Sequence, residues 1–200
     1  MRRLATLVLG VLILTGGTAL AQGRPEMSAG WRLLHISGSD TTDISGTEDE
    51  GVNLPKGWYF DVAVPITPML SIVGDIGGNY KSETESFTEQ GIVFTGTAKA
   101  SVHTFLGGIR LGATENPRVS PFAQILFGAA RGTASVEATV GGVPLIDFDE
   151  SGTEAAMSLG GGVNLNAGSF GVRLQAEWLK ILEEDSGNAF RFAAGIVIPF

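Results

Sequence analysis

Residues 191–200 read RFAAGIVIPF, and Phe190 precedes them. Every second position of this stretch is apolar, whereas the positions between hold Arg191 and mostly small residues. Such a period of two is typical of a β-strand with two different faces, because successive side chains of a strand point to opposite sides. The sequence therefore predicts a final strand that carries an apolar face as far as Phe200.

Seven earlier segments show the same alternation. With the last one, they predict strands at about residues 27–37, 56–65, 69–80, 99–111, 119–131, 153–165, 169–181 and 189–200. Each is about as long as a tilted strand must be to cross a bilayer.

The connections between these strands alternate in length. Residues 38–55, 81–98 and 132–152 are long connections, PITPM (65–69), GATENPR (112–118) and NAGS (166–169) are short, and residues 182–188 are intermediate. Long loops at one rim and tight turns at the other are typical of membrane barrels. We therefore expect an all-β fold, an eight-stranded antiparallel up-and-down transmembrane β-barrel.

The charges indicate which face of the barrel is inside. The more polar face carries only a few charged residues, of both signs, and the surface of a soluble barrel needs many more. We expect these charges to pair in a narrow lumen and to close it, while the apolar face meets lipid. The predicted lumen network comprises Arg32, Asp61, Asp75, Arg110, Arg173, Glu177 and Arg191.

The composition agrees with an apolar outer surface. Of the 200 residues, 44% are hydrophobic, 17% are charged and 29 are glycine. Cysteine is absent, which excludes disulfides and a thiolate nucleophile. The net charge of −8 argues against a nucleic-acid partner, which would need clustered Lys and Arg.

The N-terminus resembles an export signal. MRR is followed by an apolar run and then by the small residues of ALA at 19–21. The run is short for a membrane-spanning anchor, so we expect residues 1–21 to be a signal peptide, removed after export through the Sec pathway. Residues 22–200 then form one β-barrel domain.

The end of the chain resembles the recognition signal that the barrel-assembly machinery reads in bacterial outer-membrane proteins. Ile196, Ile198 and Phe200 carry this resemblance. With the signal peptide and eight strands, the chain is similar to the small OmpA, OmpX and opacity-protein group. The resemblance implies a monomer in the bacterial outer membrane, surrounded by lipid and lipopolysaccharide.

Basic and aromatic side chains mark the expected outer rim. We expect the cations to face the phosphates of lipopolysaccharide, and the aromatic residues to form half of a girdle. The basic residues are Lys56, Lys99, Arg131 and Lys180, and the aromatic residues are Trp58, Tyr80 and Trp178.

Fifteen of the 21 acidic residues fall in the four outer connections. They are Asp40, Asp43, Glu48, Asp49, Glu50, Glu83, Glu85, Glu89, Glu137, Asp147, Asp149, Glu150, Glu183, Glu184 and Asp185. One hypothesis is cation binding or adhesion, and the other is a solvated crown of loops. None of these connections has the residue order of a calcium loop, so we expect no metal site.

The evidence for catalysis is weak. Ser101 and His103 share one strand face, faintly similar to the outer-membrane lipid A deacylase, but the two residues are in reversed order and no acid is placed to orient the histidine. His35 lies three strands from His103, which argues against a shared metal. The glycine clusters at 106–108 and 159–166 do not open helices, so no cofactor is expected.

The sequence thus predicts a non-enzymatic outer-membrane barrel with a structural, adhesive or surface-interaction role through acidic extracellular loops. Two alternatives stay open. One is a transporter or channel for a small hydrophobic molecule, similar to the OmpW group. The other is a lipid A-modifying hydrolase.

Overall fold

A computed structural model describes residues 24–37, 52–89, 92–112, 118–140, 143–182 and 188–200. The strands are β1 (Glu26–Ile36), β2 (Val52–Leu54), β3 (Lys56–Pro65), β4 (Leu70–Glu89), β5 (Ile92–Gly112), β6 (Val119–Val140), β7 (Val143–Asn166), β8 (Gly171–Ile181) and β9 (Asn188–Pro199). Among the described residues, no helix has the length and apolar character needed to cross a membrane. The predicted signal peptide and the acidic residues at 40–50 and 183–185 lie outside these ranges.

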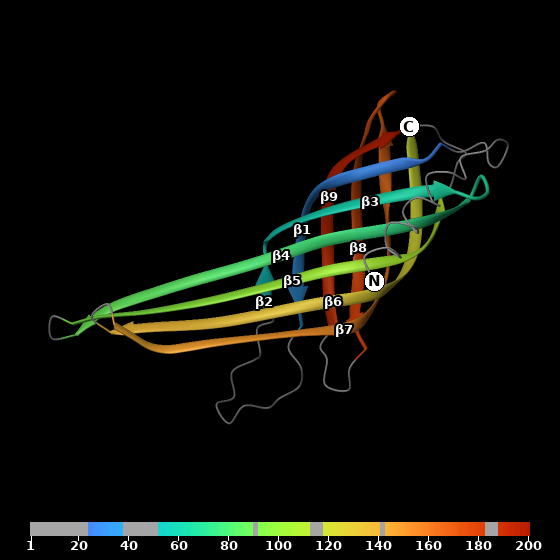
Figure 1. The fold of residues 1–200 in the computed structure, drawn as a ribbon. Coiled ribbons are helices and arrows are strands. Elements are labelled where there is room, and N and C mark those ends of the chain that lie inside the picture. Colours follow the sequence, from blue (N-terminus) through green and yellow to red (C-terminus); the bar gives the residue numbers. More distant parts are fainter. Residues whose placement is uncertain (1–23, 38–51, 90–91, 113–117, 141–142, 183–187) are drawn as a thin grey trace.

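The strands form one closed antiparallel sheet (Figure 1). Each long strand pairs with the next along the chain, and β1 pairs with β9 from Glu26↔Pro199 to Ile36↔Ala189. The three-residue β2 lies on the end of β1, in line with β3. These pairings confirm the predicted eight-stranded up-and-down barrel.

Proline 55 separates β2 from β3 and shifts the register. β1 pairs with this segment at Trp31↔Trp58 and again at Leu34↔Leu54. Between these pairs β1 has two residues and the opposite segment has three. Because proline has no N–H to donate, this extra residue forms a bulge in the strand.

The polar groups left by this bulge are satisfied by side chains. Asn79 on β4 donates from Nδ2 to the carbonyl oxygens of Arg32 at 2.9 Å and Leu54 at 3.3 Å. The Trp31 indole N–H donates to the Pro55 carbonyl at 2.8 Å. Asn79 reaches these carbonyls over Gly57, where an added Cβ would lie 2.2 Å from Asn79 Nδ2.

Two hairpins continue far past the barrel. β4 and β5 pair as far as Glu89↔Ile92, β6 and β7 pair as far as Val140↔Val143, and β5 pairs with β6 along the way. β3 leaves β4 at Tyr80, and β8 leaves β7 at Ala156. Residues 81–89, 92–100, 132–140 and 143–155 therefore form a four-stranded sheet beyond the barrel, which we call the blade (Figure 1).

The blade corrects the prediction of long loops at 81–98 and 132–152. Both segments are strands, apart from the tips at 90–91 and 141–142, which are not described. They are rich in threonine, valine and serine at alternating positions, and β-branched residues favour strands. Their polarity had suggested loops, but a sheet with one face in water accommodates polar residues at every second position.

The barrel wall separates apolar from polar side chains. Large apolar side chains on the outside are about 40–60% exposed, as for Trp58, Phe105, Phe192 and Ile196. The interior has a polar half toward Pro25 and Phe200 and an apolar layer toward the blade. The apolar layer comprises Leu34, Leu54, Ala130, Ala156, Leu179 and Ala189, with Ile36, Val102 and Ile181 packed against it. The same buried cluster also includes Ala63, Val73, Leu106 and Leu126.

Candidate functional site

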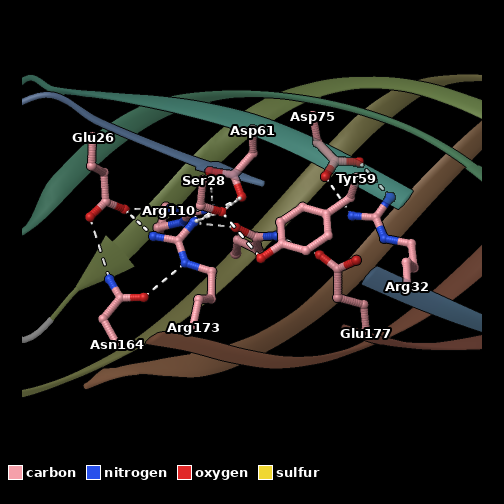
Figure 2. Close-up of polar contacts among 11 residues, drawn as sticks. Glu26, Ser28, Arg32, Tyr59, Asp61, Asp75, Arg110, Asn164, Arg173 and Glu177 are labelled. Carbon is pink, nitrogen blue, oxygen red and sulfur yellow. Dashed lines mark hydrogen bonds and ion pairs between the residues drawn. The ribbon is translucent and has the colours of Figure 1, made fainter. Parts of the chain in front are cut away.

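The half of the lumen toward Pro25 and Phe200 holds the first group of ion pairs. Arg173 contacts Asp61 at 2.7 Å and also pairs with Glu26. Arg110 contacts Glu26 at 2.7 Å and Asp61 at 3.3 Å. Ser28 donates to Asp61 at 2.9 Å. Two arginines therefore share two carboxylates, as Figure 2 shows to the left of the Tyr59 ring.

A second group of ion pairs lies between the first group and the apolar layer. Arg32 donates to both carboxylate oxygens of Asp75, at 3.1 and 2.6 Å. Arg191 contacts Glu177 at 2.6 Å and Asp75 at 3.7 Å, and donates to Ser158 at 2.8 Å. The two-point bond between the Arg32 guanidinium and the Asp75 carboxylate pairs their charges and also fixes the orientation of both side chains.

Neutral side chains connect the two groups. Gln124 accepts from Arg110 Nε at 2.8 Å and donates to Glu177. The Arg32 guanidinium lies 5.0 Å from the centre of the Tyr59 ring. The barrel interior is thus one network from Glu26 to Arg191, which Figure 2 shows in part.

The network contains equal numbers of opposite charges. Each of the seven residues predicted from the sequence is at most 4% exposed. They comprise four arginines but only three acids, and Glu26 is the fourth acid. The prediction from the sequence missed Glu26 because the first strand was expected to begin at residue 27. The signal was present, since Glu26 shares its side of the strand with Ser28 and Arg32.

The predicted basic rim lies partly within strands. Lys56 begins β3 and Lys180 lies near the end of β8, but Lys99 and Arg131 lie inside β5 and β6, because those strands continue into the blade. A groove of about 240 Å³ is lined by three lysines, by Tyr80 and Ala100, and by hydroxyl side chains; the lysines are Lys56, Lys81 and Lys99. The hydroxyl residues are Ser82, Ser101, Thr133 and Ser135.

Two of the three aromatic residues predicted to form a girdle are joined by a hydrogen bond. Trp58 donates from its indole N–H to Tyr80 Oη at 3.2 Å, and Tyr80 Oη lies 3.0 Å from His103 Nε2. Trp178 faces outward on β8. Trp31 pairs with Trp58 across β1 and β3 and is 49% exposed, so a fourth aromatic side chain lies on the outer surface beside them.

The described residues hold no group of three side chains suited to a metal ion. His35 contacts Asn53 at 2.7 Å and His103 contacts Tyr80, so the two histidines have different partners. Within the described ranges, no carboxylate is hydrogen-bonded to His103. In those ranges no carboxylate therefore takes the place of the third member of a hydrolytic triad beside Ser101 and His103.

The residues predicted as an assembly signal lie at the outer surface of the barrel wall. Ile196 and Ile198 are 55% and 44% exposed on β9. Phe200 follows the last residue of β9, and its N–H donates to the Pro25 carbonyl at 2.9 Å. The backbone of the final residue is therefore fixed to the start of β1.

Several of the acidic residues predicted to lie in loops belong to the blade. Glu83 and Glu85 lie on β4, Glu137 on β6, and Asp149 and Glu150 on β7. Glu137 contacts Lys99 at 3.3 Å, and Glu83 contacts Lys81 at 3.0 Å. Strands rather than loops hold these carboxylates outside the barrel.

No protein family model and no curated protein matches this sequence. The structure, however, is similar to solved barrels, among them Ail, the attachment invasion locus protein of Yersinia pestis. The free form of Ail has a TM-score of 0.52 at 17% identity, and its complex with the heparin analogue sucrose octasulfate has 0.55 at 16%. Each match covers 89% of this chain and 99% of Ail. The fold is that of the small outer-membrane β-barrels.

Neisserial surface protein A is a further structure of this kind. Its TM-score is 0.54 at 12% identity, over 88% of this chain and 97% of that protein. At such identities the likeness is one of fold. In this fold the strands span the membrane and the apolar outer surface faces lipid.

Proposed function

We propose that this protein is a non-enzymatic anchor in the bacterial outer membrane that holds the blade outside the cell for contact with other molecules. The observation that carries the proposal is the different length of the strands. β1, β3, β8 and β9 have 10–12 residues, enough to cross a membrane, whereas β4–β7 have 20–24. The extra residues extend the sheet by about 30 Å.

The filled interior supports an anchor rather than a channel. An eight-stranded barrel is only wide enough for its own side chains. Here four buried arginines and four acids occupy one half, and leucine and alanine side chains occupy the other. We therefore expect no wide path for water and ions through these two layers.

The comparison with Ail supports a role in surface contact. Ail is named for attachment and was solved with a sulfated heparin analogue, so this fold can present a surface for extracellular molecules. The blade of this chain carries mainly carboxylates, which would repel a polyanion. We therefore infer that its ligand is neutral or cationic.

The groove at the rim supports a second contact, with lipopolysaccharide. Lys56, Lys81 and Lys99 lie beside four hydroxyl residues and Tyr80, where we expect the lipid headgroups to begin. Phosphate accepts hydrogen bonds from both ammonium and hydroxyl groups. We propose that a phosphate of lipopolysaccharide binds there, with Arg131 and Lys180 at the same rim.

Site-specific labelling tests the proposal, because the chain has no cysteine of its own. A membrane-impermeant thiol reagent added to whole cells should modify Thr84→Cys and Thr97→Cys on the blade. It should not modify Thr67→Cys in the short turn between β3 and β4. Labelling of the turn alone would invert the orientation and overturn the proposal.

Conductance in planar bilayers tests the closed interior. Purified barrel should give no steady, large current. A stable open channel in the unmodified protein would contradict a filled lumen and would favour the transporter alternative.

A further inference from the structure

The two faces of the blade differ in polarity. The face that continues the apolar outer surface of the barrel is polar, and the face that continues the polar interior is apolar. On the side that continues the outer surface, hydroxyl groups meet across β4 and β5: Thr84 with Thr97 and Ser86 with Thr95, each pair at 3.2 Å. The side that continues the barrel interior is apolar on the two central strands, and we call it the inner face. Its central residues are Phe94, Ala98 and Ala100 on β5 and Ala134, Val136, Ala138 and Val140 on β6.

The inner face is uncovered within the described residues. Val136, Val143 and Phe148 are 44%, 67% and 52% exposed, although they lie outside the membrane-spanning part of the sheet. The inner face also adjoins the apolar layer of the lumen, through Val102 next to Ala100 on β5. A contiguous exposed apolar surface of this kind marks an interaction site.

Carboxylates line both sides of this apolar surface. Glu83 and Glu85 project from β4 beside Ala98 and Gly96, and Glu150 and Glu154 project from β7 nearer the barrel, beside Ala134 and Ala130. All four lie on the inner face by their register with the central strands. On the described part of this face the cation is Lys81, which is paired with Glu83. These five side chains together carry three more negative than positive charges.

The spacing of the strands defines what fits between the carboxylates. Across four strands, β4 and β7 are about 14 Å apart, and an α-helix with its side chains is about 10–12 Å wide. Ala98, Ala100 and Ala134 are small, so they allow a helix to approach the sheet closely. About 18 helical residues would cover the length of the blade.

We propose that the inner face of the blade binds a basic amphipathic helix. Its apolar stripe would lie on β5 and β6, and its Lys or Arg side chains on both flanks would meet Glu83 and Glu85 on one side and Glu150 and Glu154 on the other. This inference deepens the proposed function and rests on the blade being outside the cell. A strand added at the edge of the blade would leave the alanine surface uncovered, and an uncharged molecule would gain nothing from the carboxylates.

Binding can be tested with full-length barrel in zwitterionic nanodiscs and a fluorescent peptide of about 18 Leu and Lys residues in amphipathic helical order. Fluorescence anisotropy should show saturable binding, and a peptide of the same composition in scrambled order should bind much more weakly. Changing all four flanking acids to glutamine should weaken binding by about tenfold or more, because four charge contacts are lost.

Two matched variants test which face of the blade binds the peptide. Ala98→Lys adds a cation to the inner face and should abolish binding, whereas Thr97→Lys adds the same charge to the outer face and should change it little. Heat-modifiability on gels checks that each variant is folded. Unchanged binding in the four-glutamine variant, or equal loss in both lysine variants, would overturn the inference.

The two proposals fail separately. If impermeant labels reach the blade on cells but the peptide does not bind saturably, the helix site is wrong and the anchor function stands. If the labels do not reach the blade, the proposed function itself is wrong. A bound peptide with a β-strand infrared signature would also contradict the helix site and would point to the edges of β4 and β7.

Discussion

Replacing Asp75 by asparagine should strongly destabilise the barrel. Asp75 is 1% exposed, and it accepts two hydrogen bonds from Arg32 and lies 3.7 Å from Arg191. The substitution keeps the shape of the side chain but leaves two buried guanidinium groups with Glu177 as the remaining acid of the second ion-pair group. Removing one member of a buried ion pair costs about 3–5 kcal/mol. We expect the free energy of unfolding to fall by that amount.

Urea titration of barrel folded into lipid vesicles measures this change, with tryptophan fluorescence and gel mobility as independent probes. Glu85→Gln is the matched control, since it also removes one carboxylate, but from the exposed blade. That variant should stay within about 0.5 kcal/mol of the parent.

A double variant separates the charge from the packing. Arg32→Met combined with Asp75→Asn removes both partners, so the cost should be well below the sum of the two single changes. If Asp75→Asn is as stable as the parent, or if the two costs simply add, the interior is hydrated and the charges do not depend on each other.

Three further outcomes follow from the same structure. Gly57→Ala should reduce stability by about 1–3 kcal/mol in the urea titration, because its Cβ would meet Asn79, whereas Gly74→Ala, which has nothing within 4 Å, should not. Glu26→Gln should destabilise less than Asp75→Asn, because the Glu26 side chain is 23% exposed and water can replace part of the lost interaction. Changing Lys56 and Lys99 together to glutamine should lower the amount of lipopolysaccharide that copurifies with the folded barrel, measured by phosphate content; an unchanged amount would contradict the rim site.

Much of the barrel could be predicted because each wall residue faces either lipid or a crowded lumen. The alternation of apolar residues with small or polar ones is therefore clear in segments such as 191–200. The few charges on the polar side could be assigned to the interior. The same reasoning missed Glu26 because it began the first strand one residue late, although Glu26 lies on the same side of the strand as Ser28 and Arg32. Ion-pair partners such as Arg173 and Asp61 could not be named, because their contact depends on the stagger between strands, which sequence alone does not show.

The blade was not foreseen for a different physical reason. Outside the membrane, polar side chains are tolerated on a strand and in a loop alike, so the Ser and Thr residues of 82–88 did not distinguish the two. The pairing between β5 and β6 decides that these segments are strands and not loops. This pairing depends on residues far apart in the sequence, so local composition does not predict it. The bulge at Pro55 was hidden in the same way, because a proline between two apolar segments is also typical of a simple turn.

The pairing pattern inside the barrel also bears on the order in which the protein can be assembled. Arg173 is 147 positions from Glu26 and 112 from Asp61, and Arg110 is 84 from Glu26. When only the first strands of the chain have entered the membrane, Glu26 and Asp61 are present without their partner Arg173. Exposing such carboxylates to hydrocarbon is costly, so an unfinished sheet is unstable in the bilayer until β8 arrives. The charges that fill the finished barrel thus favour joining of β1 to β9 as a late and cooperative step.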